Sequence, residues 1–296
     1  MVKFEEITYK NLGKCIKMTN GETELIVSVD VGPRIVSYSF CGGENVFGEL
    51  PADFKKPTAN GYEIYGDLGV FNNFGGHRLW VSPEMKVRTS FPDNHPCKYE
   101  INGETLTVIQ NVQPVNMVQI KMEISFQWNM VKVLHTVTNC GMWDIKIAPW
   151  SISVMAKEGT LVLPMQKEGP RLLPNRNFSF WTYSDLGDKR FELTNDYVLL
   201  HQSPDAKKAF KFGMGNKSGK AAYVRGNVAF IKYFDFIEGA EYPDFGCNFE
   251  SYTDKNILEV ESVAPLKTLK QGESTSHTEY WNLKNAQLND LGGIFQ

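Results

Sequence analysis

The sequence predicts an all-β protein, built as an antiparallel β super-sandwich in which two large sheets pack face to face. Apolar and polar residues alternate with a period of two over many short segments, and Gly, Asn, Asp and Pro turn residues separate these segments. Helical patterns are scarce, and the helix we expect is a short one around residues 51–56. Strands with few crossover helices favour sheets stacked on sheets.

The clearest strand covers residues 118–127, where every second residue is apolar from Val118 to Phe126. A second strand, residues 131–139, follows after three residues, so we expect the two to form an antiparallel hairpin. The same reasoning predicts strands at residues 23–30, 105–112, 145–155, 197–202, 221–236 and 256–263.

Length and charge narrow the class of protein. We expect one domain over residues 1–296, because no repeat or linker divides the chain. With 31 basic and 34 acidic residues, the net charge of -3 creates no overall electrostatic field that would attract nucleic acid or an anionic membrane. The expected partner is therefore a small or neutral molecule. Five cysteines without a CxxC pair, and no apolar leader, predict a cytoplasmic protein. We expect either a monomer or a homodimer, because edge strands that pair between subunits resemble those that do not.

Common catalytic signatures do not occur. The glycine-rich loop at residues 213–220 has neither the dinucleotide nor the Walker spacing, and the chain contains no GxSxG or HExxH motif. The histidines lack the spacing of a metal site, so we expect neither a cofactor nor a metal.

The stretch FNNFGGHRLWVSPE, residues 71–84, is the first candidate site. We predict that His77 transfers a proton near neutral pH, that Arg78 holds a hydroxyl or an oxyanion, and that Trp80 offers a flat apolar surface. The glycines before His77 would let a ligand approach the backbone. A tight turn with an ion pair between Arg78 and Glu84 is the alternative.

Further candidates lie elsewhere in the chain. Glu250, in a segment rich in aromatic residues and poor in charge, is the predicted general base, because desolvation raises the pKa of a carboxyl group. Alternation places His135 on the inner face of its strand, in the core or lining a cleft. Arg176 and Trp181 belong to an irregular segment whose aromatic and charged side chains suit a polyhydroxylated ring, and Arg176 leaves room for an anionic substituent.

Four motifs in this order carry a family resemblance: GGHRLW-SPE, H-VTN followed by APW, YPDFG-N-E-YT, and LEVESVAPL-L-GES-H-EYW-L. They resemble the galactose mutarotase-like, or aldose 1-epimerase-like, superfamily, and more closely a bacterial branch of it. The resemblance runs from about Val29 to Leu283. It implies a β super-sandwich with a saccharide bound on its concave face.

The resemblance also implies a reaction. Epimerases of this family use a Glu to remove the proton of the anomeric hydroxyl and a His to protonate the ring oxygen, and these roles would fall to Glu250 and His77. The His that typical members carry after the TN strand is absent, since residues 138–155 read TNCGMWDIKIAPWSISVM. Three functions stay open. The first is anomer interconversion, with His135 assisting His77, and the second is carbohydrate binding without chemistry. The third is a lyase or hydrolase in which Glu84 and Glu250 flank the scissile bond of an oligosaccharide.

Overall fold

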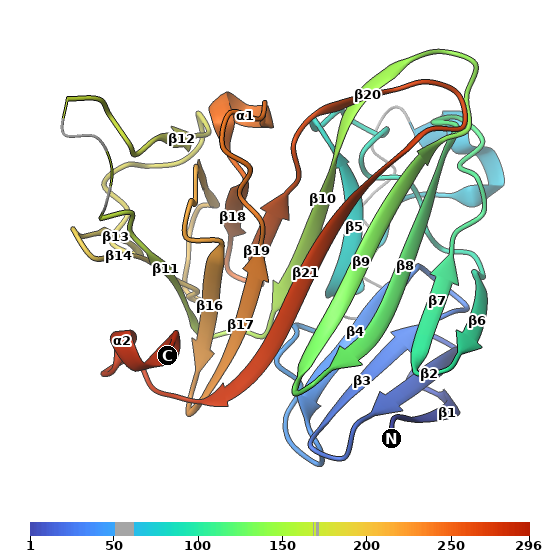
Figure 1. Cartoon of the computed structure of the whole chain (residues 1–296), viewed down its shortest axis with the longest axis horizontal. Helices are drawn as coiled ribbons and strands as arrows, with labels where there is room; N and C mark the ends of the chain where they lie inside the picture. The colour runs from blue at the N-terminus through green and yellow to red at the C-terminus, as the bar shows by residue number, and fades with distance from the viewer. Residues whose placement is uncertain (51–61, 168, 170–171) are drawn as a thin grey trace.

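The computed structural model describes residues 1–50, 62–167, 169 and 172–296, and its strands form two large sheets (Figure 1). The larger sheet has eleven strands within these residues. Its order in space is β1 (Lys3–Thr8), β2 (Lys14–Thr19), β3 (Thr23–Ser28), β4 (Arg34–Phe40), β5 (Gly76–Ser82), β10 (Ile145–Met155), β19 (Leu258–Val263), β18 (Phe249–Thr253), β15 (Phe210–Met214) and β12 (Phe178–Phe180), with β20 (Lys267–Leu269) pairing with β10.

The second sheet has ten strands within the same residues. Its order in space is β13 (Phe191–Leu193), β14 (Tyr197–His201), β11 (Thr160–Pro164), β16 (Lys220–Arg225), β17 (Val228–Phe234), β21 (Ser274–Asn285), β9 (Met130–Asn139), β8 (Val118–Gln127), β7 (Thr105–Ile109) and β6 (Lys98–Asn102). The helices are short: the 3₁₀ helix η1 (Tyr62–Leu68), α1 (Pro243–Gly246) and α2 (Leu291–Ile294). None of the helices among the described residues is long and apolar enough to cross a membrane.

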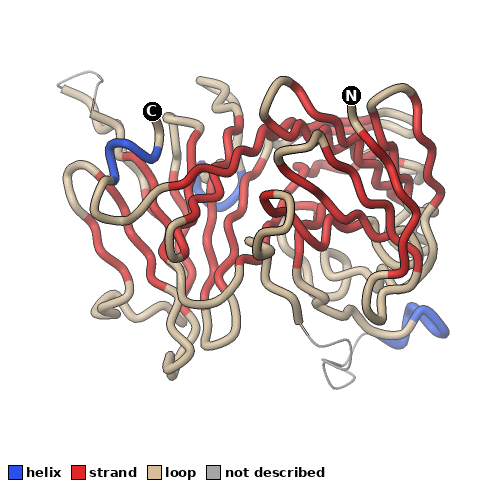
Figure 2. Tube along the Cα trace, turned by 90° about the horizontal axis from the view of Figure 1, so that it is seen from below, coloured by secondary structure: helices blue, strands red, loops and turns tan. Residues whose placement is uncertain are grey.

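The predicted fold class is confirmed. Neighbouring strands of the described chain pair in the antiparallel sense, and strands and loops dominate the trace (Figure 2). The predicted hairpin is β8 and β9, which pair from Val118–Asn139 to Gln127–Met130. The segment 221–236 contains two strands, β16 and β17, joined by a turn. The helix expected around residues 51–56 lies outside the described residues.

The main hydrophobic core lies between the two sheets. Leu79 and Val260 contribute to it from the larger sheet, and Val133, Phe230 and Trp281 from the second. Aromatic rings interlock there, with Phe230 and Trp281 at 5.7 Å between centroids. The two sheets therefore share one apolar layer, as the alternation along β8 and β9 requires.

The two glycines where β5 begins, Gly75 and Gly76, are required by the chain's own packing. Gly75 and Gly76 have φ angles of +82° and +69°, in the left-handed region. A Cβ atom on Gly75 would clash with the carbonyl oxygen of Gly48, and one on Gly76 would lie 2.5 Å from the oxygen of Ile35. The expectation that these glycines admit a ligand is wrong, because neighbouring backbone already fills the space.

We expect Gly75→Ala to lower the free energy of unfolding by about 3 kcal/mol or more, because the substitution adds a backbone clash to the cost of a positive φ. Gly103→Ala is the matched control. Gly103 also has a positive φ, +59°, but nothing lies within 4 Å of its added Cβ, so the loss there should be about 1 kcal/mol. Urea unfolding of both variants measures the difference, and equal losses would contradict the steric explanation.

Candidate functional site

Strand β5 supplies side chains to both faces of the larger sheet. His77 points into the sandwich, where its ring centroid lies 4.5 Å from that of Trp281 in the opposite sheet. Its neighbour Arg78 points to the outer face and contacts Trp80, with 4.3 Å between the guanidinium carbon and the ring centroid. Consecutive residues of a strand face opposite ways. His77, the predicted acid, and Arg78, predicted to hold a hydroxyl or an oxyanion, therefore lie on opposite faces of the sheet.

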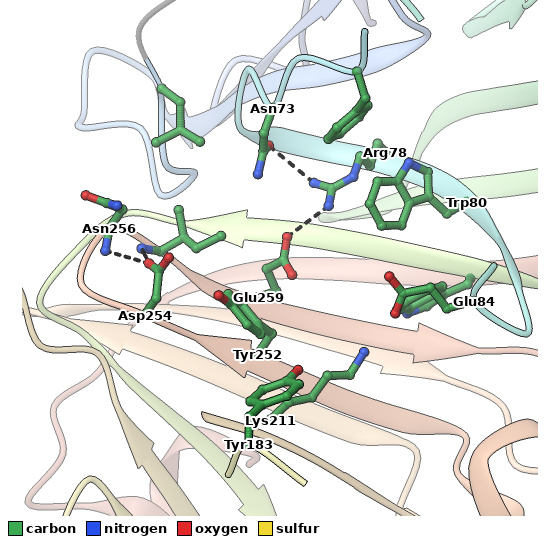
Figure 3. Close-up of a pocket in the computed structure, with 14 residues that line it drawn as sticks. Asn73, Arg78, Trp80, Glu84, Tyr183, Lys211, Tyr252, Asp254, Asn256 and Glu259 are labelled. Atoms are coloured by element: carbon green, nitrogen blue, oxygen red, sulfur yellow. Dashed lines mark hydrogen bonds and ion pairs between the residues drawn. The ribbon is translucent and has the colours of Figure 1, made fainter. Parts of the chain in front are cut away.

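The outer face carries a cleft made of two cavities that share Glu84, Trp150 and Lys211. The first cavity, about 290 Å³, is shown in Figure 3. Its other lining residues are Leu50, Phe71, Asn73, Arg78, Trp80, Tyr183, Tyr252, Asp254, Asn256, Ile257 and Glu259. The second cavity, about 500 Å³, is also lined by Tyr62, Pro83, Met85, Lys86, Ser90, Trp181, Asp244 and Glu250.

Two buried carboxyl groups and one ammonium group form a charged cluster at the cleft, which Glu250 and Lys211 line. Glu250 and Glu261 are register partners on β18 and β19. The Nζ atom of Lys211 lies 2.8 Å from Glu250 Oε2 and 3.5 Å from Glu261 Oε2. The indole N–H of Trp150 donates to Glu261 Oε2 at 2.8 Å, while Glu261 Oε1 has no hydrogen-bond partner among the described residues.

Burial dominates the acidity of this pair. It raises the pKa of Glu261 to about 7 and that of Glu250 well above its usual range, although Lys211 opposes both shifts. Burial alone would lower the pKa of Lys211, but the two carboxyl groups together raise it. One ammonium compensates one carboxylate, so the pair retains a proton near neutral pH.

An ion pair fixes the other side of the cleft. Arg78 donates to Glu259 at 2.9 Å, and its second terminal nitrogen lies 3.5 Å from the side-chain oxygen of Asn73 (Figure 3). Trp80 covers the guanidinium. The Nε atom of Arg78 has no hydrogen-bond partner among the described residues. Arg78 is therefore held rigidly, with one donor unused.

Five of the eight predicted site residues lie at the cleft: Glu250, Arg78, Trp80, Glu84 and Trp181. His77 and His135 do not, because both are fully buried between the sheets. Arg176 is exposed on a loop, where its Nε donates to the carbonyl of Gln166, so it offers no cation to a ligand in the cleft. The placement of His77, His135 and Arg176 in one site with Glu250 is wrong.

Sequence reasoning missed several residues of the cleft. Alternation in LEVESV sets Glu259 and Glu261 opposite the apolar residues and so predicts both in solvent or at the rim; Glu261 is instead completely buried. Lys211 gave one usable signal, a lone cation between Phe210 and Phe212. From the sequence alone, Trp150 could either fill the core or add to an aromatic binding surface. In the structure it lines both cavities.

A chain of hydrogen bonds joins the histidines inside the sandwich. Nδ1 of His135 lies 3.1 Å from the carbonyl oxygen of His277, which only accepts, so this nitrogen carries the proton. Nε2 of neutral His135 then accepts from Nε2 of His77 at 2.8 Å, and Nδ1 of His77 accepts from the Ser153 hydroxyl at 2.9 Å. Burial lowers the pKa of all three histidines, of His135 and His277 to about 4.

A buried ion pair adjoins this chain. The Nζ atom of Lys232 lies 2.9 Å from Glu279 Oε1, which also accepts from the hydroxyls of Ser151 and Ser262. Trp281 donates to the other carboxylate oxygen at 2.9 Å. Burial favours the neutral acid, yet the Lys232 ammonium holds the pKa of Glu279 well below its usual range.

His77, His135 and Glu279 each offer a ligand atom within 4.8 Å of the others, a grouping that can hold a metal ion. Their atoms already have partners: the imidazoles bond to each other, and Lys232 and Trp281 occupy the carboxylate. A divalent ion would also lie beside the buried ammonium. These three side chains therefore fit a buried polar network, whose members satisfy one another's hydrogen bonds, better than a metal centre.

Comparisons with known proteins identify the fold. No family model and no curated protein matches the sequence. Among solved structures, a galactose mutarotase-like protein from Lactobacillus casei matches with a TM-score of 0.60 at 10% identity, covering 91% of this chain and 100% of that one. A Klebsiella pneumoniae protein proposed to be an aldose 1-epimerase matches with a TM-score of 0.65 at 11% identity, covering 99% and 86%.

A galactose mutarotase-like protein from Clostridium acetobutylicum also matches, with a TM-score of 0.56 at 13% identity over 96% of this chain and 98% of that one. Two large antiparallel sheets that pack face to face define the class of the fold as a β super-sandwich. The chain has the galactose mutarotase-like fold.

We expect His277→Gln to reduce the loss in the free energy of unfolding that acid pH causes. A histidine kept neutral in the folded state stabilises the fold above its unfolded pKa, near 6.5, and this contribution is lost as the pH falls toward about 4. Between pH 6.5 and 4 the wild type should lose on the order of 3 kcal/mol more than the variant. Urea titrations across this range measure it.

His95→Gln is the control, because His95 is exposed. It should follow the wild-type pH dependence. If His277→Gln also follows it, the neutral interior histidine does not govern acid stability.

Proposed function

We propose that the cleft binds a saccharide and interconverts its anomers in the manner of an aldose 1-epimerase. One observation carries the proposal: two buried carboxyl groups, Glu250 and Glu261, share the ammonium of Lys211, and both Glu250 and Lys211 line an aromatic cleft. Such a pair can hold one proton and one negative charge together, which is what acid and base catalysis at one carbon requires.

The walls of the cleft suit a pyranose. In the second cavity, beside Glu250, the indole rings of Trp150 and Trp181 offer apolar surfaces to the C–H face of a sugar ring. Trp80 offers a further apolar surface in the first cavity. Arg78 and Glu259, fixed by their ion pair, present a charged donor and a charged acceptor to hydroxyl groups. The contacts in the second cavity would hold the anomeric carbon near Glu250.

The proposed reaction needs two proton transfers. The carboxyl pair accepts the proton of the anomeric hydroxyl and donates its own proton to the ring oxygen as the bond between that oxygen and the anomeric carbon breaks. Both oxygens are bonded to the same carbon, so a compact pair can serve both. Rotation about the adjacent C–C bond and closure with the transfers reversed give the other anomer. Lys211 stabilises the carboxylate throughout.

Carbohydrate binding without chemistry is the second candidate. Glu250 is only 1% exposed, and its ion pair with Lys211 at 2.8 Å competes with proton transfer. Among the described residues that line the cleft, none is a histidine. In this alternative the carboxylates accept hydrogen bonds from hydroxyl groups and the sugar leaves unchanged.

We expect Glu250→Gln to reduce the rate of anomer exchange by at least about 100-fold, since the amide cannot accept the proton. The assay follows optical rotation after single anomers of glucose, galactose and related aldoses are dissolved with the protein. Wild-type activity should also fall above about pH 7, where Glu261 loses its proton.

Glu241→Gln is the matched control, because Glu241 is exposed and pairs with Lys146 outside the cleft. It should keep full activity. Saturable sugar binding by calorimetry, without accelerated exchange of any anomer, would select the binding function and overturn the catalytic one. Full activity of Glu250→Gln would overturn the mechanism.

A further inference from the structure

The cleft is divided into two neighbouring compartments, each with its own aromatic surface and its own polar groups. Trp80 and the Arg78–Glu259 ion pair belong to the first cavity alone, while Trp181 and Glu250 belong to the second alone. Trp150, Lys211 and Glu84 line both, so they mark the passage between the two. In Figure 3, Tyr252 and Tyr183 lie across the first cavity from Arg78 and Trp80.

We infer that the cleft takes a neutral oligosaccharide of at least two units, with the reducing-end unit in the second cavity and the next unit in the first. This inference rests on the proposed function for the direction of the chain. A free anomeric hydroxyl exists only at the reducing end, and Glu250 lines only the second cavity. The adjoining unit then lies over the passage and into the first cavity.

The size of the cleft supports two units. The cavities measure about 290 Å³ and about 500 Å³, and pockets that bury a drug-sized ligand span roughly 300–1,000 Å³. A single pyranose would leave one compartment, with its tryptophan and its hydrogen-bonding groups, in contact with water. A second unit would pair those groups and cover Trp80.

The charges of the cleft select against acidic sugars. Its described lining holds three cations against five carboxylates, so phosphate or uronate groups would meet a net negative wall. The main cations are already engaged, Arg78 by Glu259 and Lys211 by Glu250. The cations are Arg78, Lys86 and Lys211, and the carboxylates are Glu84, Asp244, Glu250, Asp254 and Glu259.

Calorimetry on the full chain tests this inference without turnover. The probes are glucose, galactose, maltose, cellobiose and lactose, with glucose 6-phosphate and glucuronate as the charged comparisons. At least one disaccharide should bind tenfold or more tighter than its component monosaccharides, and the charged sugars should bind more weakly than glucose.

Two tryptophan variants separate the compartments. Trp80→Ala should abolish the advantage of the disaccharide and leave monosaccharide affinity within about threefold, whereas Trp181→Ala should weaken both. Trp128→Ala is the control, since Trp128 is 92% exposed in the turn between β8 and β9. Because Trp80 also packs on Trp150, Asn256→Ala provides a second test of the first cavity, with a several-fold loss for the disaccharide alone.

The outcomes are distinguishable. A disaccharide advantage that Trp80→Ala removes supports the inference, even if no anomer exchange occurs and the catalytic proposal fails. Equal affinity for mono- and disaccharides overturns it, even if monosaccharide anomers exchange rapidly. Tighter binding of glucose 6-phosphate or glucuronate than of glucose overturns the neutral-ligand part.

Discussion

Burial of both faces of the central strands is the constraint on which the rest of the structure depends. Strands β5, β10, β19 and β18 pack one face against the second sheet and line the cleft with the other. Because side chains alternate, each neighbouring pair in these strands is divided between the two layers. His77 and Arg78 show this most clearly, one closed inside the sandwich and the other in the cleft. A shift of one residue in register would exchange the two sets.

The polar layer inside the sandwich holds that register. Glu279 and Lys232 are fully buried, and a buried pair of this kind brings little net stability, because desolvation offsets the attraction. Breaking it is costly, since the remaining charge would have no partner. Ser151 of β10 and Ser262 of β19 both donate to Glu279 across the sandwich. Their sequence neighbours Trp150 and Glu261 therefore point to the opposite side of the sheet, where Trp150 lines the cleft and Glu261 accepts from its indole N–H, so the interior network positions the site from behind.

The same constraint explains what the sequence could and could not predict. Alternation identified β8 and β9 and their shared inner face, including His135, because one face of those strands is polar. Alternation is uninformative for β5 and β19, where polar residues stand on both faces, so it could not show that the side chains of His77 and Glu261 are buried. Composition singled out Glu250 and Trp181 as candidates, and the structure places both in the lining of the second cavity. No local signal shows that Lys211 lies between two glutamates from other strands, since those contacts depend on the pairing of the sheet.

Lys211 decides what chemistry the cleft can support. Without it, two buried carboxyl groups side by side would both remain protonated near neutral pH, and no base would exist. With two such cations both would ionise, and no acid would remain. One ammonium, 2.8 Å from one carboxylate and 3.5 Å from the other, leaves one charge and one proton in the pair. In the proposed reaction this arrangement would supply an acid and a base from two residues of the same kind, so the mechanism needs no histidine in the cleft.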